Sequence, residues 1–143
     1  MTKTPNSHSI VVGNTPYNVA NVWSRILSEI EANDFSEDDV FAVHLALEEA
    51  FANAVEHGNK AAKKEEIKID YSVGPEKVEI SVTDQGGGFD PNSVPDPRYG
   101  ENLYKTDGRG LLLMRSYMDA VEFNKRGNSV NMVRHKKKQR KFA

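Results

Sequence analysis

The sequence contains no cysteine and no long run of apolar residues. The lack of cysteine excludes disulfides and thiolate metal sites, and it fits a protein of the reducing cytoplasm. No stretch approaches the roughly 20 apolar residues that a membrane-spanning helix needs. The first residues also lack the basic segment and apolar run that are typical of a signal peptide. We therefore expect a cytoplasmic protein that does not interact with membranes.

Several signatures of phosphate and metal chemistry are missing as well. There is no G-x-x-x-x-G-K-[ST] loop, which excludes a P-loop enzyme. The loop signatures of the common protein kinases are absent too. The four histidines, His8, His44, His57 and His135, show no metal-ligand spacing.

The composition is that of one soluble domain with an uneven charge distribution. The chain has 143 residues, 38% of them hydrophobic and 28% charged, which is enough for one sizeable core. Residues 134–143 hold six of the 19 Lys and Arg residues and no acidic residue. Two interpretations of this tail remain open, a frayed solubilising end or a docking segment for an acidic partner. Direct nucleic-acid binding is not expected, because no nucleic-acid-binding module is recognisable.

The central feature is the segment DVFAVHLALEEAFANAVEHGN, residues 39–59, which predicts a helix. Ser36 and Asp39 form an S-x-x-D start signal, and Gly58 predicts the end. The apolar residues repeat at helical spacing and predict a wide core stripe: Val40, Val43, Leu47, Ala50, Phe51 and Ala54.

Glu49 and Asn53 are four residues apart, so they lie on the same face of this helix. We expect that face roughly opposite the core stripe, yet its other residues are small or apolar, which favours the floor of a pocket. An ordinary exposed polar pair is the alternative.

The rest of the chain alternates between short strands, helices and one long irregular stretch. Strands are predicted at residues 9–12, 67–73, 78–82, 120–125 and 129–134, and further helices from Pro16 to near Asn33 and from Leu111 to about Met118. The turn signal Gly74-Pro75 predicts an antiparallel hairpin. Residues 89–107 have no periodicity and three prolines, which favours a functional lid over a floppy surface insertion. This order predicts an α+β fold, a two-layer α/β sandwich with the helices on one face of a mixed, mainly antiparallel sheet.

Two glycine motifs flank the expected lid. Asp84-x-Gly86-x-Gly88 follows a strand, and Gly108-x-Gly110 opens a helix, whose N-terminal N–H groups form a ready anion site. Each motif by itself is a weak functional signal. Together with Glu49 and Asn53, in this order and spacing, the motifs form a specific signal.

This set resembles the ATP-binding (Bergerat, GHKL) fold of the gyrase, histidine kinase and MutL superfamily. It looks most like the small bacterial anti-sigma-factor serine kinases of the RsbW and SpoIIAB kind. ALEEAFANAVEHGN matches their N-box, and VTDQGGGFDP and DGRGLLLMRSYMDAVEF match their two glycine boxes. The resemblance covers roughly residues 10–133. It implies that residues 1–133 form a histidine-kinase-like ATP-binding domain and that residues 134–143 are a basic C-terminal tail.

The resemblance also implies a role for each matching residue. Glu49 would be the catalytic base or would orient the nucleophile, and Asn53 would help to hold Mg²⁺. Asp84 would accept the adenine amino group and reject guanine, which presents a carbonyl there. The remaining matching positions would contact the nucleotide or its phosphates: Gly86, Gly88, Lys105, Gly108, Arg109, Gly110, Leu111 and Ser129. Of these, Lys105 is a weaker candidate, and Ser129 stands near where many relatives have threonine.

The function that the resemblance implies is that of an ATP- and Mg²⁺-dependent serine/threonine protein kinase. It would phosphorylate an anti-sigma-factor antagonist of the STAS type. Sequestration of a sigma factor and formation of a homodimer are compatible with the resemblance but not required by it. The alternative is a nucleotide-sensing binding module in which the lid switches a partner, with little or no phosphotransfer. The presence of Glu49 favours the kinase.

Overall fold

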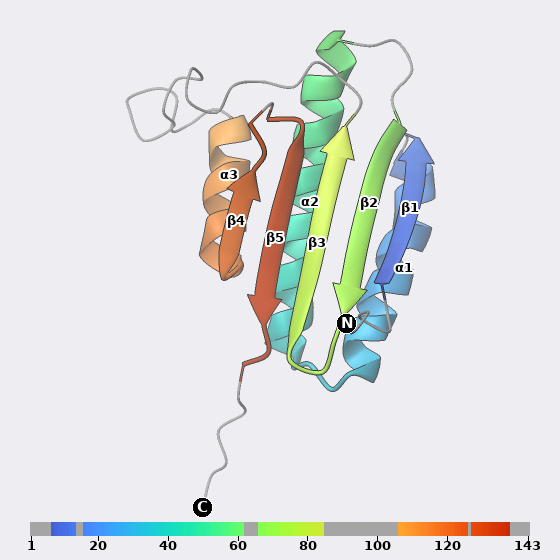
Figure 1. Cartoon of the computed structure of the whole chain (residues 1–143), viewed down its shortest axis with the longest axis vertical. Helices are drawn as coiled ribbons and strands as arrows, with labels where there is room; N and C mark the ends of the chain where they lie inside the picture. The colour runs from blue at the N-terminus through green and yellow to red at the C-terminus, as the bar shows by residue number, and fades with distance from the viewer. Residues whose placement is uncertain (1–6, 14–15, 62–65, 85–105, 126, 138–143) are drawn as a thin grey trace, which may run out of the picture.

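The computed structural model describes the chain except for residues 1–6, 14–15, 62–65, 85–105, 126 and 138–143. Its elements follow the predicted order (Figure 1). They are β1 (Ser7–Gly13), α1 (Pro16–Ala32), α2 (Glu37–Ala61), β2 (Glu66–Val73), β3 (Lys77–Asp84), α3 (Thr106–Tyr117), β4 (Ala120–Phe123) and β5 (Ser129–His135). The expected lid, residues 89–107, lies outside the described residues except for its last two, which belong to α3.

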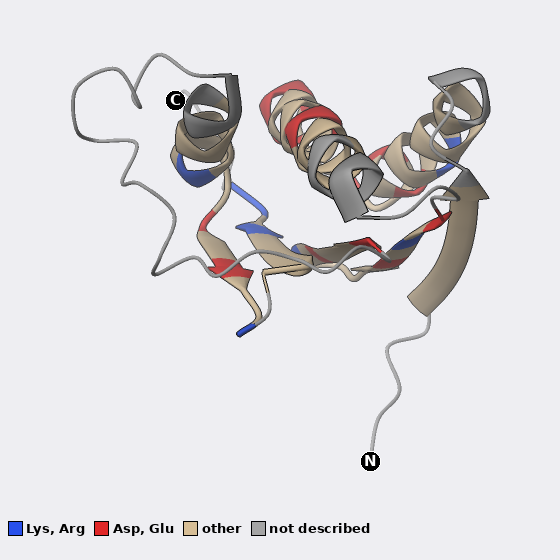
Figure 2. Cartoon of the chain, turned by 90° about the horizontal axis from the view of Figure 1, so that it is seen from above, with Lys and Arg blue, Asp and Glu red and all other residues tan. Residues whose placement is uncertain are grey.

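The five strands form one sheet in the order β1-β2-β3-β5-β4, with every neighbouring pair antiparallel. All three helices lie on the same face of this sheet (Figure 2). The predicted α+β two-layer sandwich and the β2–β3 hairpin are therefore confirmed. In the described part of the chain, no helix has the length and apolar character to cross a membrane.

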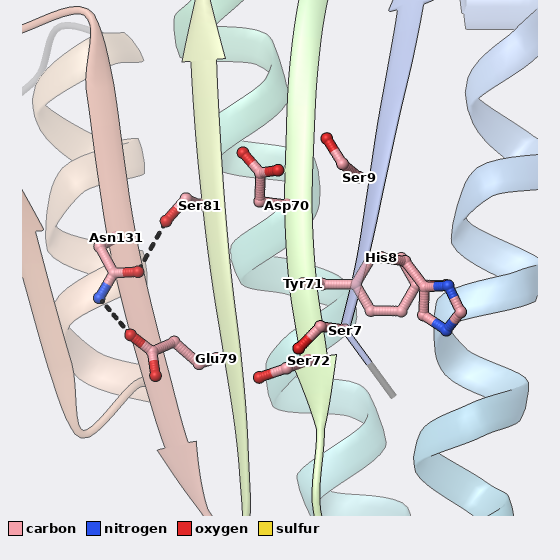
Figure 3. Close-up of a pocket in the computed structure, with 9 residues that line it drawn as sticks. All are labelled: Ser7, His8, Ser9, Asp70, Tyr71, Ser72, Glu79, Ser81 and Asn131. Carbon is pink, nitrogen blue, oxygen red and sulfur yellow. Dashed lines mark hydrogen bonds between the residues drawn. The ribbon is translucent and has the colours of Figure 1, made fainter. Parts of the chain in front are cut away.

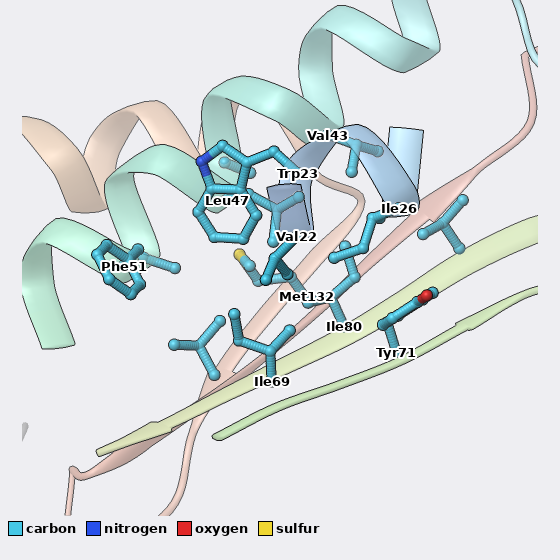
Figure 4. Close-up of a cluster of buried hydrophobic side chains, with 14 of the residues drawn as sticks. Val22, Trp23, Ile26, Val43, Leu47, Phe51, Ile69, Tyr71, Ile80 and Met132 are labelled. Atoms are coloured by element: carbon cyan, nitrogen blue, oxygen red, sulfur yellow. The ribbon is translucent and has the colours of Figure 1, made fainter. Parts of the chain in front are cut away.

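The core lies between the sheet and the helical layer (Figure 4). Alternate residues of β2 and β3 are buried because successive side chains of a strand point to opposite faces. The ring of Trp23 from α1 packs edge-on against Phe51 of α2, with 5.7 Å between the ring centroids. Each large apolar side chain buried in this layer contributes about 1.5–3 kcal/mol to stability.

Several element ends differ from the sequence prediction, and three of them concern the candidate site or the C-terminal tail. The helix α2 continues through Gly58 to Ala61, since the cost of about 1 kcal/mol for a helical glycine is offset by good helix formers beyond it. The helix α3 begins at Thr106, before the glycine motif, because Thr106 and Asp107 are residue types favoured at helix starts. The last strand, β5, continues to His135, two residues past the expected end of the folded body.

The beginning of the basic tail is bound to the folded body. The N–H of Lys136 donates to the carbonyl of Glu76 at 2.7 Å. Its ammonium group donates to the carbonyl of Asn33 at 2.6 Å and lies 4.7 Å from the centre of the Phe35 ring. Residues 134–137 are therefore part of the structure and not a frayed end, while residues 138–143 lie outside the described part.

Candidate functional site

The elements that carry the described candidate residues meet at one end of the molecule, the upper end in Figure 1. The C-terminal half of α2, the end of β3 and the beginnings of α3 and β5 all lie there. The helices α2 and α3 run in opposite directions. Phe41, early in α2, contacts the end of α3, and Glu49, later in α2, contacts its start.

Glu49 and Asn53 lie on the side of α2 that faces α3. Ala42 and Ala46 of this face are 1% exposed, because α3 covers the face as a second helix. Their small side chains let α3 pack closely against α2. Glu49 and Asn53 themselves are partly exposed. The pair therefore lies at the edge of a helix–helix contact, with its polar ends within reach of solvent.

The carboxylate of Glu49 lies against the backbone of α3 at Gly110. Gly110 is buried, and a Cβ atom placed there would lie 2.8 Å from Oε1 of Glu49. Gly110 is in the second turn of a helix whose first N–H groups have no partner within the helix. The structure thus places a carboxylate close to a helix N-terminus that can bind an anion.

Asp84, the last residue of β3, is 5% exposed and points to the helical side of the sheet, as do Ile80 and Val82. Its backbone is fixed by Asn128: the N–H of Asp84 donates to the Asn128 carbonyl at 2.8 Å, and Nδ2 of Asn128 donates to the Asp84 carbonyl at 3.2 Å. A buried carboxylate held in this way can accept a hydrogen bond from a ligand and discriminates against ligands that offer only acceptors.

Two asparagines that were not among the predicted site residues fix this end of the sheet. Oδ1 of Asn124 accepts hydrogen bonds from the N–H groups of Asn128 at 3.1 Å and Ser129 at 3.3 Å. Gly127 between them has a φ of 74°, which favours glycine. Asparagines flanking a glycine between two short strands are a turn signal, and this signal could have identified them.

Ser129 is separated from the other candidates. Its Oγ lies 2.7 Å from Oγ1 of Thr83, on the sheet face that none of the described helices covers. Asp84, next to Thr83, points to the opposite face because side chains alternate along a strand. Leu111 is partly buried and packs against the hydrophobic core.

The uncovered sheet face carries a shallow depression of about 400 Å³ (Figure 3). Its lining is polar, and Asn131 joins Ser81 and Glu79 in it by hydrogen bonds of 2.7 and 3.1 Å. None of the predicted site residues lines this depression, so it is separate from the candidate site.

The remaining candidates are only partly described. Gly86, Gly88 and Lys105 lie outside the described residues, and Gly108 and Arg109 are placed only as backbone in the first turn of α3. Within the described residues, no cluster of three or more His, Asp or Glu side chains could hold a metal ion. A Mg²⁺ ion would fit here as it does in many phosphate sites, with few protein oxygens, such as that of Asn53, and phosphates and water as the other ligands.

Comparisons with known proteins agree with this arrangement. Residues 12–134 match the family model of the histidine kinase-like ATPase domain. The serine-protein kinase RsbW of Bacillus licheniformis is 33% identical over 116 residues, which cover 74% of this chain and 71% of the relative. The proteins of the same name from Bacillus subtilis (strain 168) and Listeria innocua are each 30% identical over 108 residues, 71% of this chain and 68% and 69% of the relatives.

The family match spans α1, α2, α3 and the four strands β2 to β5, and thus includes every residue placed in the candidate site. The same elements bring Glu49 to Gly110 and place Asp84 beneath the helical layer. The chain therefore belongs to the family of histidine kinase-like ATPase domains and is related to the RsbW serine-protein kinases.

Proposed function

We propose that this protein is an ATP-dependent serine/threonine protein kinase whose acceptor is an anti-sigma-factor antagonist. The observation that carries the proposal is the contact between the Glu49 carboxylate and Gly110 in the second turn of α3. It brings a potential base to the helix terminus that would bind the phosphates. The relatives named serine-protein kinase support the activity, and the antagonist as acceptor follows from the sequence resemblance.

The nucleotide would be selected and held by three groups of this chain. The buried carboxylate of Asp84 would accept a hydrogen bond from the exocyclic amino group of adenine. The N–H groups at the start of α3 would donate to the phosphates, with the helix dipole favouring their negative charge. Asn53, one turn beyond Glu49 on the same face, would offer its amide oxygen to Mg²⁺, which neutralises charge on the phosphates when it is bound.

Glu49 would act on the acceptor. A serine hydroxyl would attack the γ-phosphorus, so that an O–P bond forms to the serine and the bond from the γ-phosphorus to the β,γ-bridging oxygen breaks. The serine proton passes to the Glu49 carboxylate, and ADP leaves with the electron pair of the broken bond. Glu49 is partly exposed, as it must be if a second protein is to reach it.

The test is transfer of labelled phosphate from ATP to a purified antagonist, with Glu49→Ala compared with Glu31→Ala. Glu31 is the matched control because it is an exposed glutamate on α1, which lies on the other side of α2 from α3 (Figure 2). Glu49→Ala should lose transfer by roughly 10²–10⁴-fold and keep its ATP affinity, whereas Glu31→Ala should transfer normally. ATP binding without any transfer by the natural protein would instead indicate a nucleotide sensor.

A further inference from the structure

A line of exposed apolar side chains follows the outer side of the contact between α2 and α3. Phe41 is 58% exposed although it is one of the largest apolar residues of the chain, and Leu113 is 36% exposed. The Phe41 ring packs edge-on against Tyr117, with 5.9 Å between centroids and 74° between the ring planes. This contact connects the two helices at the end opposite the candidate site.

The register of the two antiparallel helices is fixed by two contacts. Phe41 meets Tyr117, and eight residues further along α2, Glu49 meets Gly110. Leu45 lies one turn after Phe41, and Leu113 lies one turn before Tyr117, so both fall between the two contacts on the same side of their helices. We call this line of Phe41, Leu45, Leu113 and Tyr117 the α2–α3 seam.

The seam leads directly to Glu49. Eight residues of α-helix correspond to roughly 12 Å, so Phe41 lies about that far along the axis from the candidate base. A stable protein–protein interface covers about 800 Å² of each partner, a patch considerably wider than this distance. A protein that brings a serine to Glu49 would therefore extend over the seam.

The residues bordering the seam determine the chemistry of its occupant. Glu37, Asp38 and Glu48 are exposed on α2 beside Phe41 and Leu45, and Figure 2 marks acidic positions along the ribbon of α2. On the α3 side, Leu112 and Ser116 are exposed and uncharged. The surface is thus apolar along its centre and negatively charged along one border, which fits a partner with apolar side chains next to Lys or Arg.

We propose that the α2–α3 seam is the docking surface for the acceptor protein, whose contact segment combines apolar residues with basic ones. The proposal rests on the proposed kinase function and adds where the acceptor binds. Exposed aromatic side chains of this kind are enriched among the residues that dominate binding energy, and Phe41 is the most exposed of the large apolar side chains in the described part of the chain.

The experiment compares Phe41→Ala with Val11→Ala. Val11 is 57% exposed, almost as much as Phe41, but lies on β1 at the far edge of the sheet. With the purified antagonist as acceptor, Phe41→Ala should raise the KM for the antagonist about tenfold. The kcat at saturating antagonist and the Kd for ATP should be unchanged. Val11→Ala should match the natural protein in all three quantities. An unchanged KM for Phe41→Ala would overturn the docking surface.

Direct binding separates this proposal from the kinase function. Calorimetry with the antagonist, in the presence of ATP and the Glu49→Ala substitution, measures docking without transfer. If the natural protein transfers no phosphate but Phe41→Ala weakens this binding tenfold, the docking surface stands and the kinase function fails. If transfer occurs and Phe41→Ala binds the antagonist normally, the kinase function stands and the docking surface fails. If Phe41→Ala instead changes only the sedimentation of the protein, the seam binds a second copy and the proposal is wrong.

Discussion

The buried carboxylate of Asp39, in the first turn of α2, forms an ion pair with Arg134 of β5, 95 residues later. Nε and Nη2 of Arg134 lie 2.9 and 2.8 Å from Oδ1 of Asp39, and Nη1 donates to the carbonyl of Tyr117, the last residue of α3, at 2.7 Å. Oδ2 of Asp39 accepts from the N–H groups of Ser36 at 3.4 Å and Lys137 at 3.3 Å. This ion pair therefore connects α2, α3 and β5 at the end opposite the candidate site, with Arg134 making the contact to α3.

We expect Arg134→Met to be strongly destabilising, because it leaves the Asp39 carboxylate buried without its cation. Asp39 is fully buried and the Arg134 side chain is 11% exposed, and breaking such a pair costs about 3–5 kcal/mol. The free energy of unfolding should fall by about this amount in urea titrations. Trp23, the chain's one tryptophan, is 5% exposed and provides the fluorescence signal.

The control for this prediction is Lys137→Met. It removes an ion pair of 3.0 Å with Asp119 in which both side chains are considerably exposed, so the loss should stay below about 1 kcal/mol. Equal losses for the two substitutions would mean that burial is not what makes the Asp39–Arg134 pair important.

Asp119 should make the stability depend on pH in the acid range. Burial by itself raises the pKa of Asp119, but hydrogen bonds from the His135 N–H at 2.7 Å and Lys137 Nζ at 3.0 Å outweigh it, and the net pKa is lowered. A lowered pKa stabilises the fold above the unfolded-state pKa of about 3.9, and this contribution is lost as the pH falls through the folded-state pKa.

The corresponding measurement is the urea midpoint at pH 7 and at pH 3. Asp119→Asn should lower the midpoint at pH 7 and reduce the difference between the two pH values. Asp70→Asn is the control, since Asp70 has an exposed pair of 3.9 Å with Lys68. If Asp119→Asn leaves the pH dependence as it is in the natural protein, these hydrogen bonds do not stabilise the charged form.

Local patterns predicted much of the fold. The S-x-x-D signal is confirmed as a capping box, with the N–H of Asp39 donating to Oγ of Ser36 at 3.1 Å. The hairpin turn is confirmed by the bond from the Gly74 N–H to the Lys77 carbonyl at 2.9 Å. Helical spacing was also sufficient to place Glu49 and Asn53 together. These features depend on residues close in sequence, where spacing and residue type decide the geometry.

Features that depend on the pairing of distant strands could not be predicted from the sequence. Nothing local relates Arg134 to Asp39, because their contact requires the position of β5 in the sheet. The face on which Ser129 lies follows from its register with Thr83, and a shift of one residue would reverse it. The covering of the Glu49 face of α2 could not be predicted for a similar reason, since it comes from α3, more than 50 residues later.

Asp84→Asn should reduce the discrimination between ATP and GTP. An amide can accept from the adenine amino group through its oxygen and donate to the guanine carbonyl through its nitrogen, whereas a carboxylate can only accept. We expect the ratio of the two affinities, measured by calorimetry, to fall roughly tenfold, the value of one hydrogen bond to a charged group. Thr83→Val, next along β3 but on the uncovered face, should leave the ratio unchanged. Equal affinity of the natural protein for both nucleotides would exclude this role of Asp84.

Gly110→Ala should damage phosphotransfer much more than stability. The added methyl group would lie 2.8 Å from Oε1 of Glu49, which is too close, but the obstructing atom is the end of a flexible side chain. The carboxylate can move away at little energetic cost, and alanine in a helix is favoured over glycine by about 1 kcal/mol. Unfolding should therefore be nearly unchanged, while transfer to the antagonist should fall about 100-fold because the base is displaced. Gly74→Ala is the control, since a Cβ atom added there would lie an ordinary 3.7 Å from the Lys77 carbonyl oxygen.

A double-mutant cycle tests whether the loss acts through Glu49. In the Glu49→Ala background there is no carboxylate for the methyl group to displace, so Gly110→Ala should cause no further loss of transfer, and the two effects should be far from additive. Additive losses would show that Gly110 is needed for another reason, such as close approach of phosphate to the backbone of α3. Measurement of the ATP Kd for all four proteins separates these cases, because a displaced carboxylate leaves nucleotide affinity intact, whereas an obstructed phosphate site weakens it even when Glu49 is absent.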